Sequence, residues 1–252
     1  MYIFVFSGDP VKSSRKAKPH ELTPEQEEEI NTILNMTSNL PVVDTPRLKL
    51  NRDDLWTLRD GENVNDNIIS CYLTMLMNRK RPQGSDLPRI CKMSTFFYGR
   101  LKNSGYETVK KWAYSDIFAF DIIFVPIHSQ EPKHWTLAVI DMTKNNESIT
   151  YYDSCRGRDK GVLKTLLSYL EKEHISKKRT PMKIKFKLEV CKHLPTQTTV
   201  VDCGPFMLNY AYCISRRKDF NFDQNDIPFI RKRIFFEILN GKFLDDITNP
   251  HV

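Results

Sequence analysis

Three short stretches of the chain contain the residue types of a thiol hydrolase. His134 precedes the strand-like run WTLAVIDM, Asp153 ends the run SITYYD, and Cys203 lies in LPTQTTVVDCGPFML, six residues after Gln197. A thiolate can attack a carbonyl carbon while an imidazole takes and returns the proton and a carboxylate fixes the imidazole's tautomer. We therefore predict Cys203 as nucleophile, His134 as base and Asp153 as orienting acid. The Gln197 amide is the predicted donor to the oxyanion that develops.

The residues after Cys203 predict a buried helix that begins at or near this cysteine. The apolar positions Phe206, Met207, Tyr210, Ala211 and Ile214 recur at helical spacing. The unpaired N–H groups and the positive end of the helix dipole favour a thiolate in a first helical turn. Asp202 would disfavour the thiolate if it faced the sulfur, so we expect it to point away or to cap the helix.

Three strands are expected in close succession, at 121–127, 135–142 and 148–153. Their connections are short, with EPK in the first and KNN in the second, so the strands should pair antiparallel. In such a hairpin His134 begins one strand and Asp153 ends its neighbour, which places the two residues at the same end of the sheet. His128, six residues before His134, is the rival base.

Other patterns predict the elements around this core. Thr23 and Gln26 form a capping box that should start a helix with Pro24 at its first position, and Asn65 or Asp66 should cap a second helix. Further helices are expected near 94–104, 160–174, 203–215 and 226–240, and a strand near 183–190. The prediction is one α+β domain over residues 21–246, with a central, mostly antiparallel sheet flanked by helices, after a basic tail at 1–20.

Composition and charge argue against a membrane-spanning protein and against a zinc site. The 252 residues carry a formal net charge of +7 and six cysteines, and the longest apolar runs are far shorter than the roughly 20 residues that span a bilayer. No cysteine or histidine spacing is typical of a zinc site, and we predict neither a metal nor disulfides. The basic stretches 177–187, 215–218 and 231–233 suggest an acidic partner, whereas no nucleic-acid motif is present. KSSRKAK at 12–18 is compatible with a nuclear address or a flexible tail.

The stretches STFFYGRLKNSGYETVKKW, IIFVPIH, HWTLAVID, ITYYDS and RKRIFFEIL resemble the Ulp1/sentrin-specific protease family. The resemblance covers roughly residues 20–246. It implies a papain-like cysteine protease fold of the Ulp1 type and cleavage after the C-terminal Gly-Gly of SUMO. It also implies a monomer without cofactor that acts in the nucleus or cytoplasm, and the catalytic roles given above. By the same resemblance Trp135, Asn63 and Asp66 contact the substrate, with Trp135 lining the channel for the diglycine tail.

Two departures from the family pattern bear on activity. Asn63 stands where the family usually has a tryptophan over the diglycine, and Val200-Val201 stands where it usually has Gly-Ser. Two alternatives therefore stay open: a NEDD8-specific protease of the same fold, and a weakly active or inactive SUMO-binding homologue.

Overall fold

A five-stranded sheet carries the predicted acid and base. The computed structural model describes residues 21–37, 41–45, 48–82, 84–112 and 116–248, so the predicted tail at 1–20 lies outside the described residues. The strands are β3 (Ile90–Lys92), β4 (Ile122–Gln130), β5 (Lys133–Asp141), β6 (Ser148–Tyr152) and β7 (Lys187–Val190), adjacent in that order.

The sheet is mixed rather than antiparallel throughout. The three central strands β4, β5 and β6 pair antiparallel as predicted, whereas β3 and β7 pair parallel to their neighbours. Parallel neighbours need a crossover connection, and here α4 (Phe97–Ser104) follows β3 and α5 (Lys160–Lys178) follows β6. The α+β class is confirmed, and the helical crossovers account for its two parallel edges.

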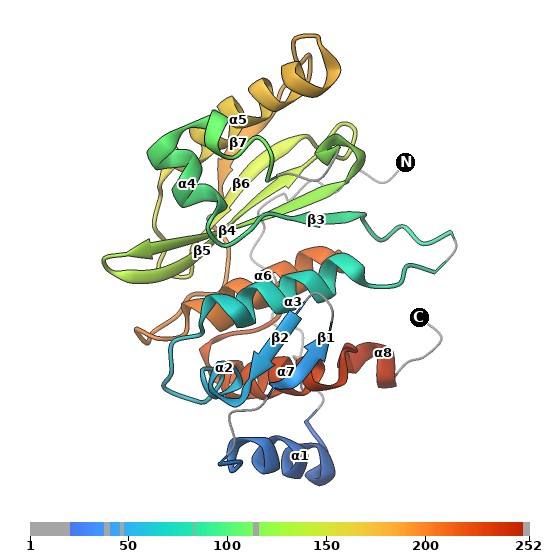
Figure 1. Cartoon of the computed structure of the whole chain (residues 1–252), viewed down its shortest axis with the longest axis vertical. Helices are drawn as coiled ribbons and strands as arrows, with labels where there is room; N and C mark the ends of the chain where they lie inside the picture. Colours follow the sequence, from blue (N-terminus) through green and yellow to red (C-terminus); the bar gives the residue numbers. More distant parts are fainter. Residues whose placement is uncertain (1–20, 38–40, 46–47, 83, 113–115, 249–252) are drawn as a thin grey trace.

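Side chains alternate between the two faces of β5 and so build two apolar clusters. Trp135, Leu137 and Val139 join one cluster, and Ala138 and Ile140 join the other. Helices α3 (Asp66–Asn78) and α6 (Cys203–Ser215) cover the first face, and α4 and α5 cover the second (Figure 1). This packing brings the first turn of α6 against the strand that begins near His134.

The remaining elements pack beyond α3 and α6. They are α1 (Pro24–Leu34), the hairpin of β1 (Pro41–Thr45) and β2 (Leu48–Asn51), α2 (Arg52–Trp56), α7 (Ile227–Asn240), which follows a 3₁₀ turn at Gln224–Asp226, and α8 (Leu244–Thr248). The 3₁₀ turns at Tyr106–Thr108 and Ile117–Ala119 instead pack with the cluster on the α4 and α5 side of the sheet. The capping box of Thr23 and Gln26 is confirmed. Asn65, rather than Asp66, caps α3 by accepting a hydrogen bond from the Ile68 backbone N–H at 3.0 Å.

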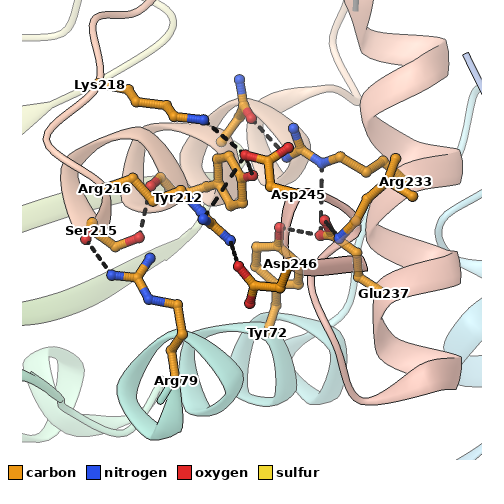
Figure 2. Close-up of polar contacts among 12 residues, drawn as sticks. Tyr72, Arg79, Tyr212, Ser215, Arg216, Lys218, Arg233, Glu237, Asp245 and Asp246 are labelled. Atoms are coloured by element: carbon orange, nitrogen blue, oxygen red, sulfur yellow. Dashed lines mark hydrogen bonds and ion pairs between the residues drawn. The ribbon is translucent and has the colours of Figure 1, made fainter. Parts of the chain in front are cut away.

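A buried polar network fixes α7 against its neighbours (Figure 2). The Tyr72 hydroxyl of α3 donates to the fully buried Glu237 carboxylate of α7 at 2.6 Å. Arg233 donates to the Asn209 side chain of α6 at 2.8 Å and lies 3.7 Å from Glu237. The Tyr212 hydroxyl of α6 extends the network to α8. Because these partners are buried and specific, α7 has a fixed rotation relative to α6.

All six cysteines are free. Within the described ranges, no helix combines the length and the apolar character that crossing a membrane requires.

Candidate active site

The β5–β6 hairpin brings the predicted base and acid together. Leu137 of β5 lies opposite Tyr152 of β6, so His134 and Asp153 lie at the same end of the pair. His134 Nε2 and Asp153 Oδ1 are 2.7 Å apart. The hairpin therefore produces the His–Asp contact that the strand boundaries predicted.

A tight turn after β6 holds the Asp153 carboxylate. Oδ1 also accepts a hydrogen bond from the Cys155 backbone N–H at 2.8 Å, and Oδ2 accepts one from Gly157 N–H at 3.0 Å. Burial acts to raise the pKa of Asp153, but the hydrogen bonds from His134 and the turn outweigh it and lower that pKa. A side chain at 157 would place its Cβ 2.1 Å from Oδ2, so this position needs glycine.

His134 lies between the carboxylate and the predicted nucleophile. Its hydrogen bond with Asp153 and its interaction with the Cys203 thiol raise its pKa to about 9. Since Nε2 faces Asp153, Nδ1 is the nitrogen left for Cys203. Cys203 is the first residue of α6 and is 2% exposed. The imidazole is therefore protonated at neutral pH and joined to both partners.

Asp202 points away from the thiol and makes no side-chain cap on α6. Its Oδ1 accepts from Arg231 Nε and Nη2 at 3.1 and 2.7 Å, and its Oδ2 accepts from the Thr199 hydroxyl and the Gln224 amide at 2.5 and 2.7 Å. Burial opposes the net lowering of the Asp202 pKa, which these hydrogen bonds produce. The first of the two expected orientations of Asp202 is therefore correct.

Arg231 also binds the loop between α2 and α3. It is 1% exposed and donates to the carbonyls of Arg59 and Glu62 at 2.9 and 2.8 Å, and to the Val201 carbonyl at 3.2 Å. One buried guanidinium thus fixes the 57–62 loop to the residues immediately before Cys203. The prediction that stretch 231–233 faces an acidic partner is wrong for both of its arginines, which are buried.

The 57–62 loop leads directly into one wall of the site. The Trp135 indole N–H donates to the Val64 carbonyl at 2.9 Å. A Cβ on Gly204 would lie 2.7 Å from the Val64 Cβ, so the start of α6 approaches Val64 as closely as glycine allows. Trp135, Val64 and Gly204 thereby form one continuous wall beside Cys203.

Gln197 is tied to the turn that carries the acid. Its backbone N–H donates to the Ser154 carbonyl at 3.0 Å, and its side-chain oxygen accepts from the Ser154 hydroxyl at 2.6 Å. Its amide nitrogen donates to the Thr199 carbonyl at 2.7 Å. An amide nitrogen carries two hydrogens, so the second can serve an oxyanion while the first holds the loop.

The rival base lies in a different setting. The His128 ring stacks on Trp135 with centroids 4.4 Å apart, and its Nδ1 is 3.4 Å from the Gln130 amide nitrogen. Burial lowers the pKa of His128, although the nearby Asp66 charge opposes this. His128 therefore lacks the direct carboxylate partner that His134 has.

The position that resembles the family's tryptophan site is open to solvent. Asn63 is exposed, and Asp66 is half-buried at the start of α3. Trp56 is occupied elsewhere, because the guanidinium groups of Arg52 and Arg59 stack on its ring at 4.2 and 4.0 Å. Trp56 is therefore not free to replace a tryptophan at position 63.

Three residues of the site belong to none of the sequence motifs: Gly157, Arg231 and the exposed Cys155. Helical spacing could have identified Arg231, because it falls four residues after Ile227 and three before Ile234, on the buried face of α7. Nothing in local spacing distinguishes Cys155 or Gly157.

The mixed sheet, the thiol at the start of α6 and the hydrogen-bonded His–Asp pair define the class of papain-like cysteine hydrolases. The Ulp1 protease family, C-terminal catalytic domain, matches residues 62–242. The chain is 37% identical over 211 residues to a sentrin-specific protease of Caenorhabditis elegans, and 34% identical over 232 residues to Homo sapiens sentrin-specific protease 2. These alignments cover 83% and 89% of this chain but 30% and 38% of the relatives, so the chain spans about a third of their length.

Two solved structures have similar folds. The C-terminal Ulp1 protease domain in complex with Smt3, the yeast ortholog of SUMO, matches with a TM-score of 0.73 and 24% identity over 88% of this chain and 96% of that one. The Chaetomium thermophilum Ulp1-like SUMO protease catalytic domain matches with a TM-score of 0.74 and 25% identity, over 90% and 93%. The chain belongs to the Ulp1 protease family.

The first prediction tests the turn that holds Asp153. In Gly157→Ala the new methyl group must displace the carboxylate from His134, so kcat/KM should fall on the order of 10–100-fold. Gly99→Ala in α4 is the matched control, because nothing lies within 4 Å of its added Cβ. Peptidase assays of both variants decide the point, and equal activities would show that Asp153 tolerates the shift.

The second prediction tests Arg231. Lysine keeps the charge but cannot serve all the acceptors of the guanidinium, so Arg231→Lys should lose on the order of 1–3 kcal/mol of stability and also a large part of kcat. Arg233→Lys, at another buried arginine of α7, should lose comparable stability and keep its kcat. Thermal unfolding and kinetics, measured where both variants are folded, separate the two effects. If Arg231→Lys and Arg233→Lys lost kcat to the same extent, Arg231 would contribute to stability but not specifically to the geometry of the site.

The third prediction concerns pH. The His134 pKa is raised in the folded state, from an unfolded value near 6.5 to about 9. Its contribution to stability is therefore fully present below about pH 6.5 and is lost as pH rises through about 9. The difference in unfolding free energy between the wild type and His134→Ala, followed from pH 6 to 10 by denaturant titration, should shrink across this window. A difference that is constant or grows would contradict the raised pKa.

Proposed function

We propose that this protein is a cysteine peptidase that cleaves after the C-terminal Gly-Gly of SUMO, in precursors, in conjugates to lysine, or in both. The observation that carries the proposal is the placement of His134 between the Asp153 carboxylate and the Cys203 thiol at the start of α6. The similarity to sentrin-specific proteases favours SUMO over NEDD8 as the modifier.

The groups present account for both halves of the reaction. With the proton already on His134, the Cys203 thiolate attacks the carbonyl carbon of the last glycine. The oxyanion accepts hydrogen bonds from the Gln197 amide and the Cys203 backbone N–H. His134 then protonates the departing amine, and water, deprotonated by the same imidazole, hydrolyses the thioester. Asp153 stabilises the imidazolium in each step.

The wall beside Cys203 supports a preference for glycine. The Val64 carbonyl fixes Trp135 through a hydrogen bond from the indole N–H. The Val64 side chain in turn lies so close to Gly204 that a methyl group on residue 204 would not fit. A tail that threads past these residues to reach the sulfur gains from lacking side chains of its own. Of the residues predicted to contact the substrate, Trp135 is the one that belongs to this wall.

The complete set of Cys203, His134, Asp153 and Gln197 favours an active enzyme over a non-catalytic binder of SUMO. We further propose that the protein acts as a monomer in the nucleus or cytoplasm, without nucleic acid and without a cofactor. Hydrolysis by a thiol peptidase needs only a nucleophile, a base, an orienting acid and an oxyanion donor, which these four residues supply.

The function is tested by cleavage of a SUMO fusion that extends past Gly-Gly. The wild type should release the extension, Cys203→Ser should be inactive while it still binds SUMO, and His134→Ala should lose nearly all activity. Asp153→Ala should lose less, because the carboxylate only orients and stabilises the base. Cys213→Ser, at the far end of α6, and His128→Ala are the controls. An inactive control with an active Cys203→Ser or His134→Ala would overturn the assignment.

A separate prediction concerns the effect of Asn63 on catalytic efficiency. A tryptophan here would cover the glycine tail and exclude water, which is worth on the order of 1–3 kcal/mol, so Asn63→Trp should raise kcat/KM. Asn146→Trp, on an exposed asparagine in the β5–β6 loop at the opposite end of the hairpin, controls for a general effect of the added aromatic ring. Steady-state cleavage of one SUMO precursor measures both variants. An unchanged or lower kcat/KM in Asn63→Trp means that the tail is already held without it.

A further inference from the structure

Cys155 places a second thiol beside the base and its acid. One ligand atom each from His134, Asp153 and Cys155 lie within 4.8 Å of one another. Cys155 is exposed, and its backbone N–H is bonded to the Asp153 carboxylate at 2.8 Å, so the turn holds the cysteine close to that carboxylate. The reaction described above makes no use of this side chain.

We propose that His134, Asp153 and Cys155 bind a single Zn²⁺ ion, which reversibly blocks the enzyme. An imidazole nitrogen, a carboxylate oxygen and a thiolate sulfur are the ligand types that Zn²⁺ takes in proteins, and three of them with a water complete a tetrahedral site. The neutral imidazole, carboxylate and thiolate together carry a charge of −2, which the cation neutralises. On binding, the Cys155 thiol and the protonated imidazole each release one proton to solvent.

The geometry requires only local movement. With metal–ligand distances of about 2.0–2.3 Å, tetrahedral ligand atoms lie roughly 3.3–3.8 Å apart. His134 and Asp153 must open from 2.7 Å, and Cys155 must close from within 4.8 Å, which rotation of an exposed cysteine side chain can supply. The cation takes the place of the proton that the imidazole and the carboxylate share. The cation on Nε2 leaves a proton on Nδ1 toward Cys203, and an imidazole with both nitrogens occupied cannot accept another proton, so His134 no longer acts as a base while the metal is bound.

The competing arrangement is a cation held by the nucleophile Cys203 and His134, without Cys155. The two arrangements differ in which sulfur is bonded to the metal. In the proposed site Cys203 is not a ligand, so the metal should bind a protein from which the Cys203 thiol has been removed.

Cobalt(II) titration distinguishes the two, because a tetrahedral Co²⁺–thiolate bond absorbs in the near ultraviolet and the visible. Cys203→Ser should keep these bands with an affinity close to that of the wild type. Cys155→Ser, which keeps the backbone N–H to Asp153, should bind at least 10-fold more weakly and lose the sulfur band. Zn²⁺ should displace Co²⁺ from Cys203→Ser. Bands that survive in Cys155→Ser and vanish in Cys203→Ser, or no sulfur band in Cys203→Ser, would overturn the proposal.

A kinetic measurement addresses the inhibition. With cleavage of the SUMO fusion expressed relative to each protein's own metal-free rate, the Zn²⁺ concentration for half inhibition should rise at least 10-fold in Cys155→Ser, and EDTA should restore the wild type. Equal sensitivity of both proteins would contradict a role of Cys155 in inhibition. The cobalt titration needs no substrate, so its outcome is independent of whether SUMO is the modifier.

Discussion

The buried pair of Arg231 and Asp202 is the interaction on which the geometry of the site depends. Removing two charges from water is costly, and such a pair is favourable only when the remaining donors and acceptors are satisfied. Here the guanidinium also donates to carbonyls of the 57–62 loop and of Val201, while Asp202 accepts from Thr199 and Gln224. The pair turns a carboxylate away from the adjacent thiol and simultaneously positions the loop that leads to Val64.

The site joins two parts of the fold, a hairpin formed by local strand pairing and a helix positioned by tertiary packing. His134 and Asp153 come from a hairpin, whose pairing fixes their separation with little help from the rest of the chain. Cys203 comes from the first turn of α6, which reaches the hairpin only because α6 packs on the face of β5 that carries Trp135 and Leu137. The Trp135 indole spans both parts, since it lies one residue after the base and donates to the wall beside the nucleophile.

The sequence was sufficient where the determining contacts are local. Two-residue alternation and short connections predicted the three central strands, and helical spacing predicted a helix starting at Cys203, as the structure has it. The parallel edges of the sheet depend on helical crossovers, whose direction no periodicity shows. Arg231 was misassigned because a run of three basic residues looks solvent-exposed, whereas its acceptors lie 29 residues away at Asp202 and more than 160 away in the 57–62 loop. The surroundings of Cys155 and Gly157 depend on the turn after β6, which is not evident from spacing alone.

The central claim is that Cys203, held in this way, is the nucleophile toward the last glycine of SUMO. It is tested most directly with SUMO, NEDD8 and ubiquitin that each carry an electrophile in place of the C-terminal carboxylate. The account predicts a stoichiometric adduct with the SUMO probe, which peptide mapping by mass spectrometry locates on Cys203, and little or no adduct with the other two. No adduct with SUMO, preferential reaction with NEDD8 or ubiquitin, or an adduct located on another of the six cysteines would contradict it.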